Sequence, residues 1–102
     1  MVSDQTMRKP EAHSGLALYY YDGCPYCMRV QRVIDRLGVP VEMRNILRDR
    51  KHQDDLIAAR GRRTVPVLRI TDGDGRDEWM PESTDIVDYL EQRFGSQARA
   101  GV

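Results

Sequence analysis

A strand pattern, a helix pattern and a second strand pattern, in that order, constrain the fold of this chain most. Leu16 to Tyr21 (LALYYY) is an apolar and aromatic run with the length of a buried strand, and Val41 to Ile46 (VEMRNI) alternates like a second one. Between them, apolar residues recur at the spacing of an amphipathic helix: Val30, Val33, Ile34 and Leu37. Gly38 stands where that helix is expected to end. A strand, a crossover helix and a strand predict a parallel pair.

The second half of the chain predicts a helix and then a hairpin. Residues Arg50 to Ala59 form a weaker helical pattern, which Gly61 ends. Val65 to Ile70 (VPVLRI) is typical of a third strand. The DGDG sequence at 72–75 is a strong turn signal and leads into a fourth strand around residues 78–80. The hairpin adds antiparallel strands to the parallel pair.

A last amphipathic helix completes the expected fold. Its apolar residues are Ile86, Val87, Leu90 and Phe94. Ser83 or Thr84 is the expected N-cap, and Gly95 is expected just beyond the helix end. We therefore predict an α/β fold with a mixed four-stranded sheet in βαβ-αββα order and helices on both faces.

Length and charge narrow the class of protein. The 102 residues fit one domain, which we place at 16–95, between a flexible N-terminal tail at 1–15 and a C-terminal tail at 96–102. Sixteen Lys and Arg balance sixteen Asp and Glu, so nothing in the total charge indicates nucleic acid or a membrane surface. No apolar segment has the length of a secretory or membrane-spanning one. We expect a cytoplasmic protein that starts at Met1 or Met7.

The balanced total conceals two segments of opposite charge. Residues 44–63 hold seven basic residues against three acids, and residues 72–91 hold eight acids against one arginine. Two solvated faces are the ordinary explanation of such runs. The alternative is that the basic segment lies beside a site for an anionic small molecule.

Both cysteines of the chain lie in one short motif, Cys24-Pro25-Tyr26-Cys27, between the first strand and the first helix. A disulfide there closes a four-residue loop and is expected to stabilise the fold by only about 2 kcal/mol. A structural zinc site needs four ligands, and only His13 and His52 are available beside the cysteines, so we expect no metal. A close pair of thiols in a reducing compartment favours a redox couple.

The position of Cys24 supports redox chemistry. The N-terminus of a helix presents unpaired N–H groups and the positive end of the helix dipole, and both favour a thiolate over a thiol. Pro25 suits the first helical position, where its missing N–H group is not needed. Cys27 lies within one turn and can reach a mixed disulfide formed on Cys24. We predict that Cys24 is the nucleophile and Cys27 the resolving thiol.

The chain from 16 to 95 resembles the glutaredoxins, which have the thioredoxin-like fold. The resemblance rests on CPYC at 24–27, on Thr64-Val65-Pro66, and on an acid-and-serine segment before the last helix. It implies a cis bond between Val65 and Pro66 facing the cysteines, and a backbone at Val65 that pairs with the cysteinyl part of glutathione. Glutathione is the expected cosubstrate.

Further glutathione contacts are implied by the same resemblance. Dithiol glutaredoxins often have a Gln eleven residues before this Thr, which is Gln53 here, and Arg63 is a second candidate for the glycine carboxylate. Alternatively, both are solvated surface side chains that do not contact glutathione. Tyr26 is expected to shape the groove beside the nucleophile.

The chain departs from ordinary glutaredoxins in two places. Tyr21-Asp22 stands where the family usually has a basic residue before the first cysteine, and the Asp22 carboxylate is expected to oppose thiolate formation. Glu82-Ser83 is similar to the Glu-Ser segment of glutathione transferase N-terminal domains, which implies that both hold the γ-glutamyl group. Ser83 is also explained as a simple N-cap.

We expect a glutathione-dependent thiol–disulfide oxidoreductase that reduces protein disulfides or glutathionylated proteins. One alternative is a non-catalytic thioredoxin-like module that binds glutathione, an iron–sulfur cluster or a partner. Another is a glutathione transferase-like N-terminal domain acting on electrophiles. A complete transferase is not expected, because no helical second domain follows Val102.

Overall fold

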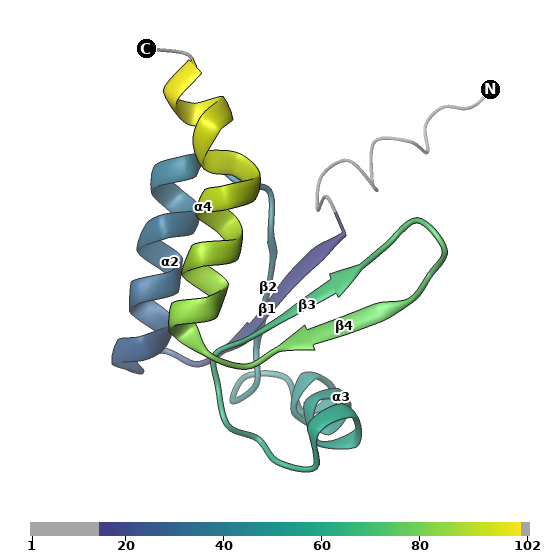
Figure 1. Ribbon diagram of the computed structural model, residues 1–102. Coiled ribbons are helices and arrows are strands. Elements are labelled where there is room, and N and C mark those ends of the chain that lie inside the picture. The colour runs from purple at the N-terminus through teal and green to yellow at the C-terminus, as the bar shows by residue number, and fades with distance from the viewer. Residues whose placement is uncertain (1–14, 101–102) are drawn as a thin grey trace, which may run out of the picture.

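The computed structural model describes the backbone of residues 15–100 and the side chains of residues 15–95. In this part of the chain, the helices and strands follow the predicted order (Figure 1). They are β1 (Leu16–Tyr20), α2 (Pro25–Leu37), β2 (Glu42–Asn45), α3 (Arg50–Arg60), β3 (Val67–Thr71), β4 (Asp77–Met80) and α4 (Ser83–Ala100). None of the helices described is long and apolar enough to cross a membrane.

The sheet is mixed, and its strand order is β2-β1-β3-β4. β1 pairs with β2 in parallel and with β3 antiparallel, and β3 pairs with β4 antiparallel. Helices α2 and α4 lie side by side on one face, whereas α3 lies on the other (Figure 1). The predicted fold class, a thioredoxin-like mixed sheet with helices on both faces, is confirmed.

Alternation along the strands divides the core into two clusters, one for each face of the sheet. Leu16, Leu18 and Leu68 face α2 and α4, where they pack with the apolar sides of those helices. Ala17 and Tyr19 point the other way, toward α3. The second cluster has these buried members: Ala17, Tyr19, Cys24, Cys27, Ile46, Leu56, Val65 and Val67. Both cysteines therefore belong to the smaller cluster, on the α3 side.

Two helices end where glycine was expected. Gly38 and Gly61 follow α2 and α3, and both have the left-handed conformation, with φ of 68° and 73°. The N–H group of Gly61 donates to the carbonyl of Ile57 at 2.7 Å. These caps satisfy carbonyl groups that a helix end leaves without partners.

Several predicted boundaries were wrong, most of them by one residue, and three have a clear physical reason. β3 begins at Val67 rather than Val65, since Pro66 has no N–H group to donate to a neighbouring strand. The last helix passes through Gly95 and reaches Ala100, because a glycine weakens a helix interior by only about 1 kcal/mol. That helix also starts earlier than expected: the Glu82 carbonyl accepts the first helical bond from Ile86, so neither Ser83 nor Thr84 is the N-cap.

The predicted hairpin turn is confirmed and has a clear cause in Asp72. Its carboxylate accepts hydrogen bonds from the backbone N–H groups of Asp74 at 2.8 Å and of Arg76 at 3.0 Å. An aspartate that bonds to the backbone ahead of it is a common turn device. The predicted N-terminal tail lies outside the described residues except for Gly15, and the domain limits at 16–95 stay a prediction.

Candidate active site

The cysteine pair lies at the start of α2, where the first strand of the sheet passes into the helix. Cys24 is the N-cap, with extended backbone angles, and Pro25 occupies the first helical position. The Cys24 sulfur accepts a hydrogen bond from the backbone N–H group of Cys27 at 3.4 Å. Both cysteines are free thiols. The arrangement directs an N–H donor and the positive helix end at the Cys24 sulfur.

The two thiols differ in their surroundings. Cys27 is fully buried, and Cys24 is 5% exposed. Burial raises the pKa of the Cys27 thiol to about 12, and the neighbouring Cys24 adds to the rise against a backbone hydrogen bond at Tyr21. Cys27 is therefore protonated at neutral pH.

The segment before β3 lies against the cysteines. The peptide bond between Val65 and Pro66 is cis, as the resemblance to glutaredoxins implied. Val65 is buried in the cluster that holds both thiols, whereas Thr64 is exposed. The structure thus brings together Cys24, Cys27 and Val65.

The start of α4 lies at the same end of the molecule. In Figure 1 the first turns of α2 and α4 and the segment before β3 are all at the lower end of the sheet. Glu82 is exposed and Ser83 is half-buried at the first turn of α4. A helix N-terminus at this place is suited to an anionic group.

The remaining predicted contact residues are placed less favourably. Tyr26, two residues after Cys24, is 64% exposed. Arg63 is exposed in the loop after α3. Gln53 lies on α3, where its side-chain amide donates to the Ile46 carbonyl at 3.3 Å. The amide of Gln53 is thus engaged within the chain.

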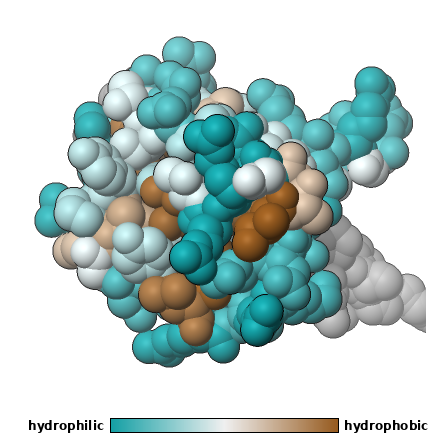
Figure 2. Space-filling model, turned by 90° about the horizontal axis from the view of Figure 1, so that it is seen from below, coloured by the Kyte–Doolittle hydropathy of each residue, from teal (hydrophilic) through white to brown (hydrophobic). Residues whose placement is uncertain are grey.

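Apolar side chains are exposed around this end of the molecule. Figure 2 views it from below and shows separate hydrophobic patches among hydrophilic side chains. Met28, four residues after Cys24 in α2, is 43% exposed, and Leu47, in the turn after β2, is 67% exposed. Met28 therefore leaves apolar surface close to the cysteine motif.

Sequence reasoning missed an arginine next to the cysteine motif. Arg48 donates from Nη2 to the Asp22 carboxylate at 3.3 Å, and Asn45 donates to the same carboxylate oxygen at 3.4 Å. Asp22 precedes Cys24 by two residues, so a cation does lie beside this segment. No spacing signal could have found it, because the two partners are 26 residues apart.

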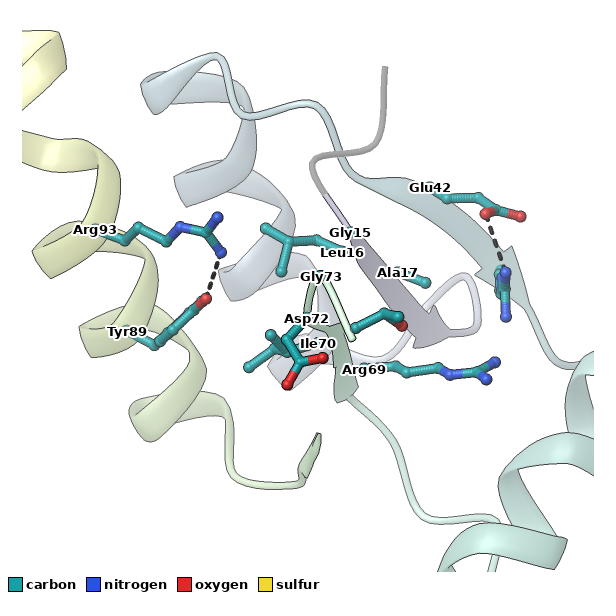
Figure 3. Close-up of a pocket in the computed structure, with 12 residues that line it drawn as sticks. Gly15, Leu16, Ala17, Glu42, Arg69, Ile70, Asp72, Gly73, Tyr89 and Arg93 are labelled. Carbon is teal, nitrogen blue, oxygen red and sulfur yellow. Dashed lines mark hydrogen bonds and ion pairs between the residues drawn. The ribbon is translucent and has the colours of Figure 1, made fainter. Parts of the chain in front are cut away.

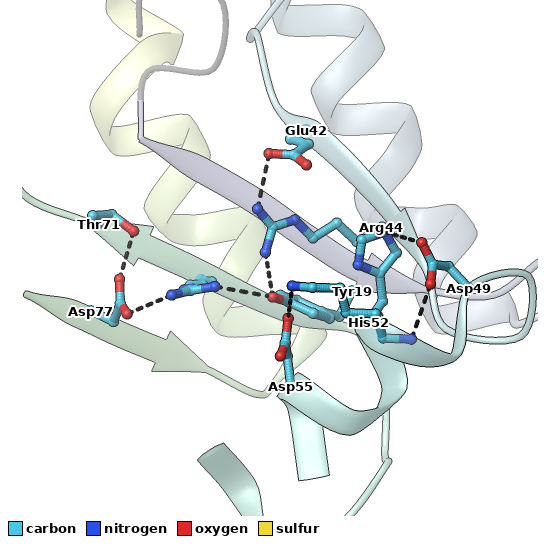
Figure 4. A network of polar contacts seen from close by, with 10 residues as sticks. Tyr19, Glu42, Arg44, Asp49, His52, Asp55, Thr71 and Asp77 are labelled. Carbon is cyan, nitrogen blue, oxygen red and sulfur yellow. Dashed lines mark hydrogen bonds and ion pairs between the residues drawn. The ribbon is translucent and has the colours of Figure 1, made fainter. Parts of the chain in front are cut away.

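A polar network on the α3 face of the sheet was also missed (Figure 4). The hydroxyl of the fully buried Tyr19 accepts hydrogen bonds from Arg44 at 2.5 Å and from Arg69 at 3.3 Å. Arg44 also pairs with Glu42 at 3.0 Å, and Arg69 pairs with Asp77 at 2.7 Å. The Arg69 guanidinium, with help from Thr71, lowers the pKa of the Asp77 carboxyl.

A cavity of about 830 Å³ lies at the other end of β1 (Figure 3). Gly15 and Leu16 at the start of β1 line it together with Arg44, Arg69 and Arg93. None of the predicted glutathione-binding residues is among those that line it. The cavity and the cysteine motif are therefore separate features.

Among residues 15–95, no group of three or more His, Cys, Asp or Glu side chains could hold a metal ion. His13 lies outside the described residues. His52 is half-buried on α3, with its ring edge-on to Tyr19 at 6.3 Å between ring centroids. Its Nε2 atom lies 3.5 Å from the Asp49 carboxylate.

Known proteins resemble this chain over most of its length. A family model for the glutathione S-transferase N-terminal domain matches residues 18–98. Glutaredoxin 2 of Escherichia coli is 33% identical over 86 residues, which are 84% of this chain and 37% of that protein. The chain thus spans little more than a third of the length of the curated relatives that it matches.

Solved structures of two such proteins are also similar to this chain. Glutaredoxin 2 of Salmonella typhimurium, in complex with glutathione, is 30% identical with a TM-score of 0.58, over 74% of this chain and 32% of that one. Maleylacetoacetate isomerase of Anaeromyxobacter dehalogenans, with bound dicarboxyethyl glutathione, is 30% identical with a TM-score of 0.59, over 78% and 37% of the two chains. The chain belongs to the family of glutathione S-transferase N-terminal domains.

Proposed function

We propose that this protein is a glutathione-dependent thiol–disulfide oxidoreductase that works through Cys24 and Cys27. Its similarity to glutaredoxin 2 and to transferase folds supports a glutathione-related thiol oxidoreductase or transferase-like function. The observation that carries the finer proposal is the unequal pair of thiols. Cys24 receives an N–H donor at a helix start, while burial keeps Cys27 protonated.

In the proposed reaction, the Cys24 thiolate attacks the glutathionyl sulfur of a protein–glutathione disulfide. The S–S bond breaks, the protein sulfur leaves and takes a proton from solvent, and glutathione remains on Cys24 as a mixed disulfide. A second glutathione thiolate attacks that disulfide, so that glutathione disulfide leaves and the Cys24 thiolate returns. Each turnover consumes one free glutathione: its thiol proton balances the proton taken up by the protein sulfur, and the substrate's own glutathionyl group forms the other half of the glutathione disulfide.

Protein disulfides follow a second branch of the same scheme. Cys24 attacks one sulfur of the substrate disulfide, and the other sulfur leaves and takes a proton from solvent. Cys27 then attacks the Cys24 sulfur, and its proton passes to the bound substrate sulfur, which leaves as a thiol. Cys27 is close enough for this attack, because its backbone N–H group already donates a hydrogen bond to the Cys24 sulfur. Glutathione reduces the resulting bond between Cys24 and Cys27.

The glutathione groove is proposed along the end of the molecule that carries the motif. The Val65 backbone would pair with the cysteinyl part as an added strand does, with Thr64 and Pro66 on either side and Tyr26 beside the sulfur. Glu82 and Ser83 would hold the γ-glutamyl group at the start of α4. Support comes from the relatives with bound glutathione.

Arg63 and Gln53 are not equally good candidates for binding the glycine carboxylate of glutathione. Arg63 is exposed and can reach out to the glycine carboxylate of glutathione. Gln53 would first have to release the Ile46 carbonyl. We therefore assign that carboxylate to Arg63 ahead of Gln53.

Single cysteine replacements test the proposal. Cys24→Ser should reduce glutathione-coupled turnover of a small glutathione mixed disulfide to the uncatalysed rate. Cys27→Ala should retain most of that turnover and lose the reduction of protein disulfides, since only the second branch needs Cys27. Equal loss of the first activity in both variants would contradict the assigned roles.

A transferase-like reaction is the second candidate, favoured by the family match and by the isomerase relative. In that case Cys24 or a neighbouring group would activate glutathione for attack on an electrophile. Conjugation of glutathione to an aryl halide measures this activity directly. A rate above background that survives Cys24→Ser would favour it over the disulfide reaction.

A further inference from the structure

The chain segment that leads to Cys24 carries an exposed carboxylate, that of Asp22. Asp22 lies two residues before the nucleophile in the connection between β1 and α2. Two residues of extended chain span at most about 7 Å between Cα atoms, which is less than the Debye length of about 8 Å at physiological salt. By itself this carboxylate would repel anionic disulfides.

Arg48 is held against that carboxylate by the turn after β2. The Ile46 N–H group donates to the Tyr20 carbonyl at 2.8 Å, which continues the β1–β2 pairing to the edge of the connection. Asn45 is 8% exposed, and its side-chain oxygen accepts from the N–H groups of Leu47 at 2.9 Å and Arg48 at 3.1 Å. Its amide nitrogen donates to Asp22 at 3.4 Å. One buried side chain thus joins the Arg48 turn to the Asp22 segment.

The positive charge of Arg48 balances the negative charge of Asp22. Arg48 Nη2 lies 3.3 Å from Asp22 Oδ2, and both side chains are largely exposed, at 78% and 65%. Asp49 follows in the turn, but its carboxylate accepts from the Lys51 backbone and lies near His52 on α3. Tyr20 and Tyr21 pack on the same cluster as the thiols.

We propose that Arg48 is a positioning residue that offsets the charge of Asp22 beside Cys24, so that the nucleophile meets anionic disulfides without a net repulsive charge. The cation that offsets Asp22 comes from the turn after β2. The inference rests on the proposed function, because it concerns how Cys24 meets its substrate. Glutathione disulfides are the anionic substrates concerned.

A pair of alkylating probes tests the charge without any enzymatic turnover. In reduced Cys27→Ala protein, Cys24 is alkylated in parallel by iodoacetamide, which is neutral, and by iodoacetate, which is anionic. The ratio of the two rate constants cancels the thiolate fraction and reports the local charge. Because exposed charges interact weakly, we expect single-charge changes of about two- to five-fold in the ratio at low salt.

We predict how the ratio of the iodoacetate to the iodoacetamide rate constant changes in each variant. Arg48→Ala leaves the carboxylate uncompensated and should lower the iodoacetate-to-iodoacetamide ratio, whereas Asp22→Asn leaves the cation and should raise it. The double variant should return close to the parent ratio, and Arg48→Lys should stay close to it. About 0.5 M salt should remove most of the differences.

Arg76→Ala is the matched control. Arg76 is equally exposed and also pairs with aspartates, but it lies in the hairpin between β3 and β4. Its ratio should equal that of the parent. An unchanged ratio in Arg48→Ala, or the same change in Arg76→Ala, would overturn the inference. The ratio can be measured even if the protein lacks glutathione-coupled turnover, so failure of the proposed function would be recognised separately.

Discussion

Replacing Tyr19 by Phe tests whether the network in Figure 4 stabilises the sheet. The Tyr19 hydroxyl is the one atom that both Arg44 and Arg69 share within the network, and the residue has no exposed surface. Phe keeps the ring, and with it the packing on Trp79 at 5.2 Å between centroids. The substitution therefore removes an acceptor from two half-buried guanidinium groups and little else.

The expected loss follows from the two hydrogen bonds. A bond that involves a charged group contributes about 1.5–3 kcal/mol, and each arginine keeps its carboxylate partner. The bond to Arg69 is long, at 3.3 Å, and should add little to the shorter one to Arg44. We expect the free energy of unfolding to fall by about 1.5–3 kcal/mol in total.

Urea unfolding of the reduced protein, followed by far-ultraviolet circular dichroism, measures this loss. The fluorescence of Trp79 is a poor signal for this variant, because the indole packs against the mutated ring. Tyr89→Phe is the matched control: its hydroxyl also accepts from an arginine, Arg93, but on the exposed side of α4. That variant should lose less than about 0.5 kcal/mol. Equal losses in the two variants would refute the stabilising role of the network.

Two further predictions concern the thiol pair and the start of the sheet. The raised pKa of Cys27, about 12 against 9.0, means that the buried thiol stabilises the fold fully below pH 9 and that this contribution is lost between pH 9 and 12, by about 1.4 kcal/mol per pH unit. Stability curves of reduced wild type and Cys27→Ala should therefore converge above pH 9, and parallel curves would contradict the assigned cause. Gly15→Ala should cost at least about 2 kcal/mol, because Gly15 has φ of 73° and its Cβ would lie 2.5 Å from the Thr71 carbonyl oxygen. Gly73→Ala, which meets nothing within 4 Å, should be close to neutral in the same urea titration.

Local patterns were enough to predict the helices, strands and cysteine motif. In α2, the spacing of apolar residues, Pro25 at the first position and Gly38 at the end all act within a few residues of one another. The errors fall at ends where local preferences compete with the rest of the fold. Gly95 is an example: it resembles a helix end by itself, yet the helix continues through it.

Contacts between distant segments could not be predicted in the same way. Tyr19 and Arg69 are 50 residues apart, and they meet because β1 and β3 pair in a register that places Ala17 opposite Arg69. The register of a strand depends on the strands that it pairs with, so the sequence of one strand does not reveal it. The Arg48–Asp22 pair depends in the same way on the β1–β2 pairing. For this reason the sequence indicated a candidate nucleophile, Cys24, but did not reveal the charge pair beside it.

The central claim is that Cys24 alone accepts glutathione from a substrate. Its most direct measurement is mass spectrometry of the reduced Cys27→Ala and Cys24→Ala variants after exposure to a glutathione mixed disulfide, with peptide mapping of the adduct. We predict rapid addition of one glutathionyl group at Cys24 in the first variant, and no comparable addition at the buried, protonated Cys27 in the second. Equal or faster modification of Cys27, or no adduct on Cys24, would contradict the account.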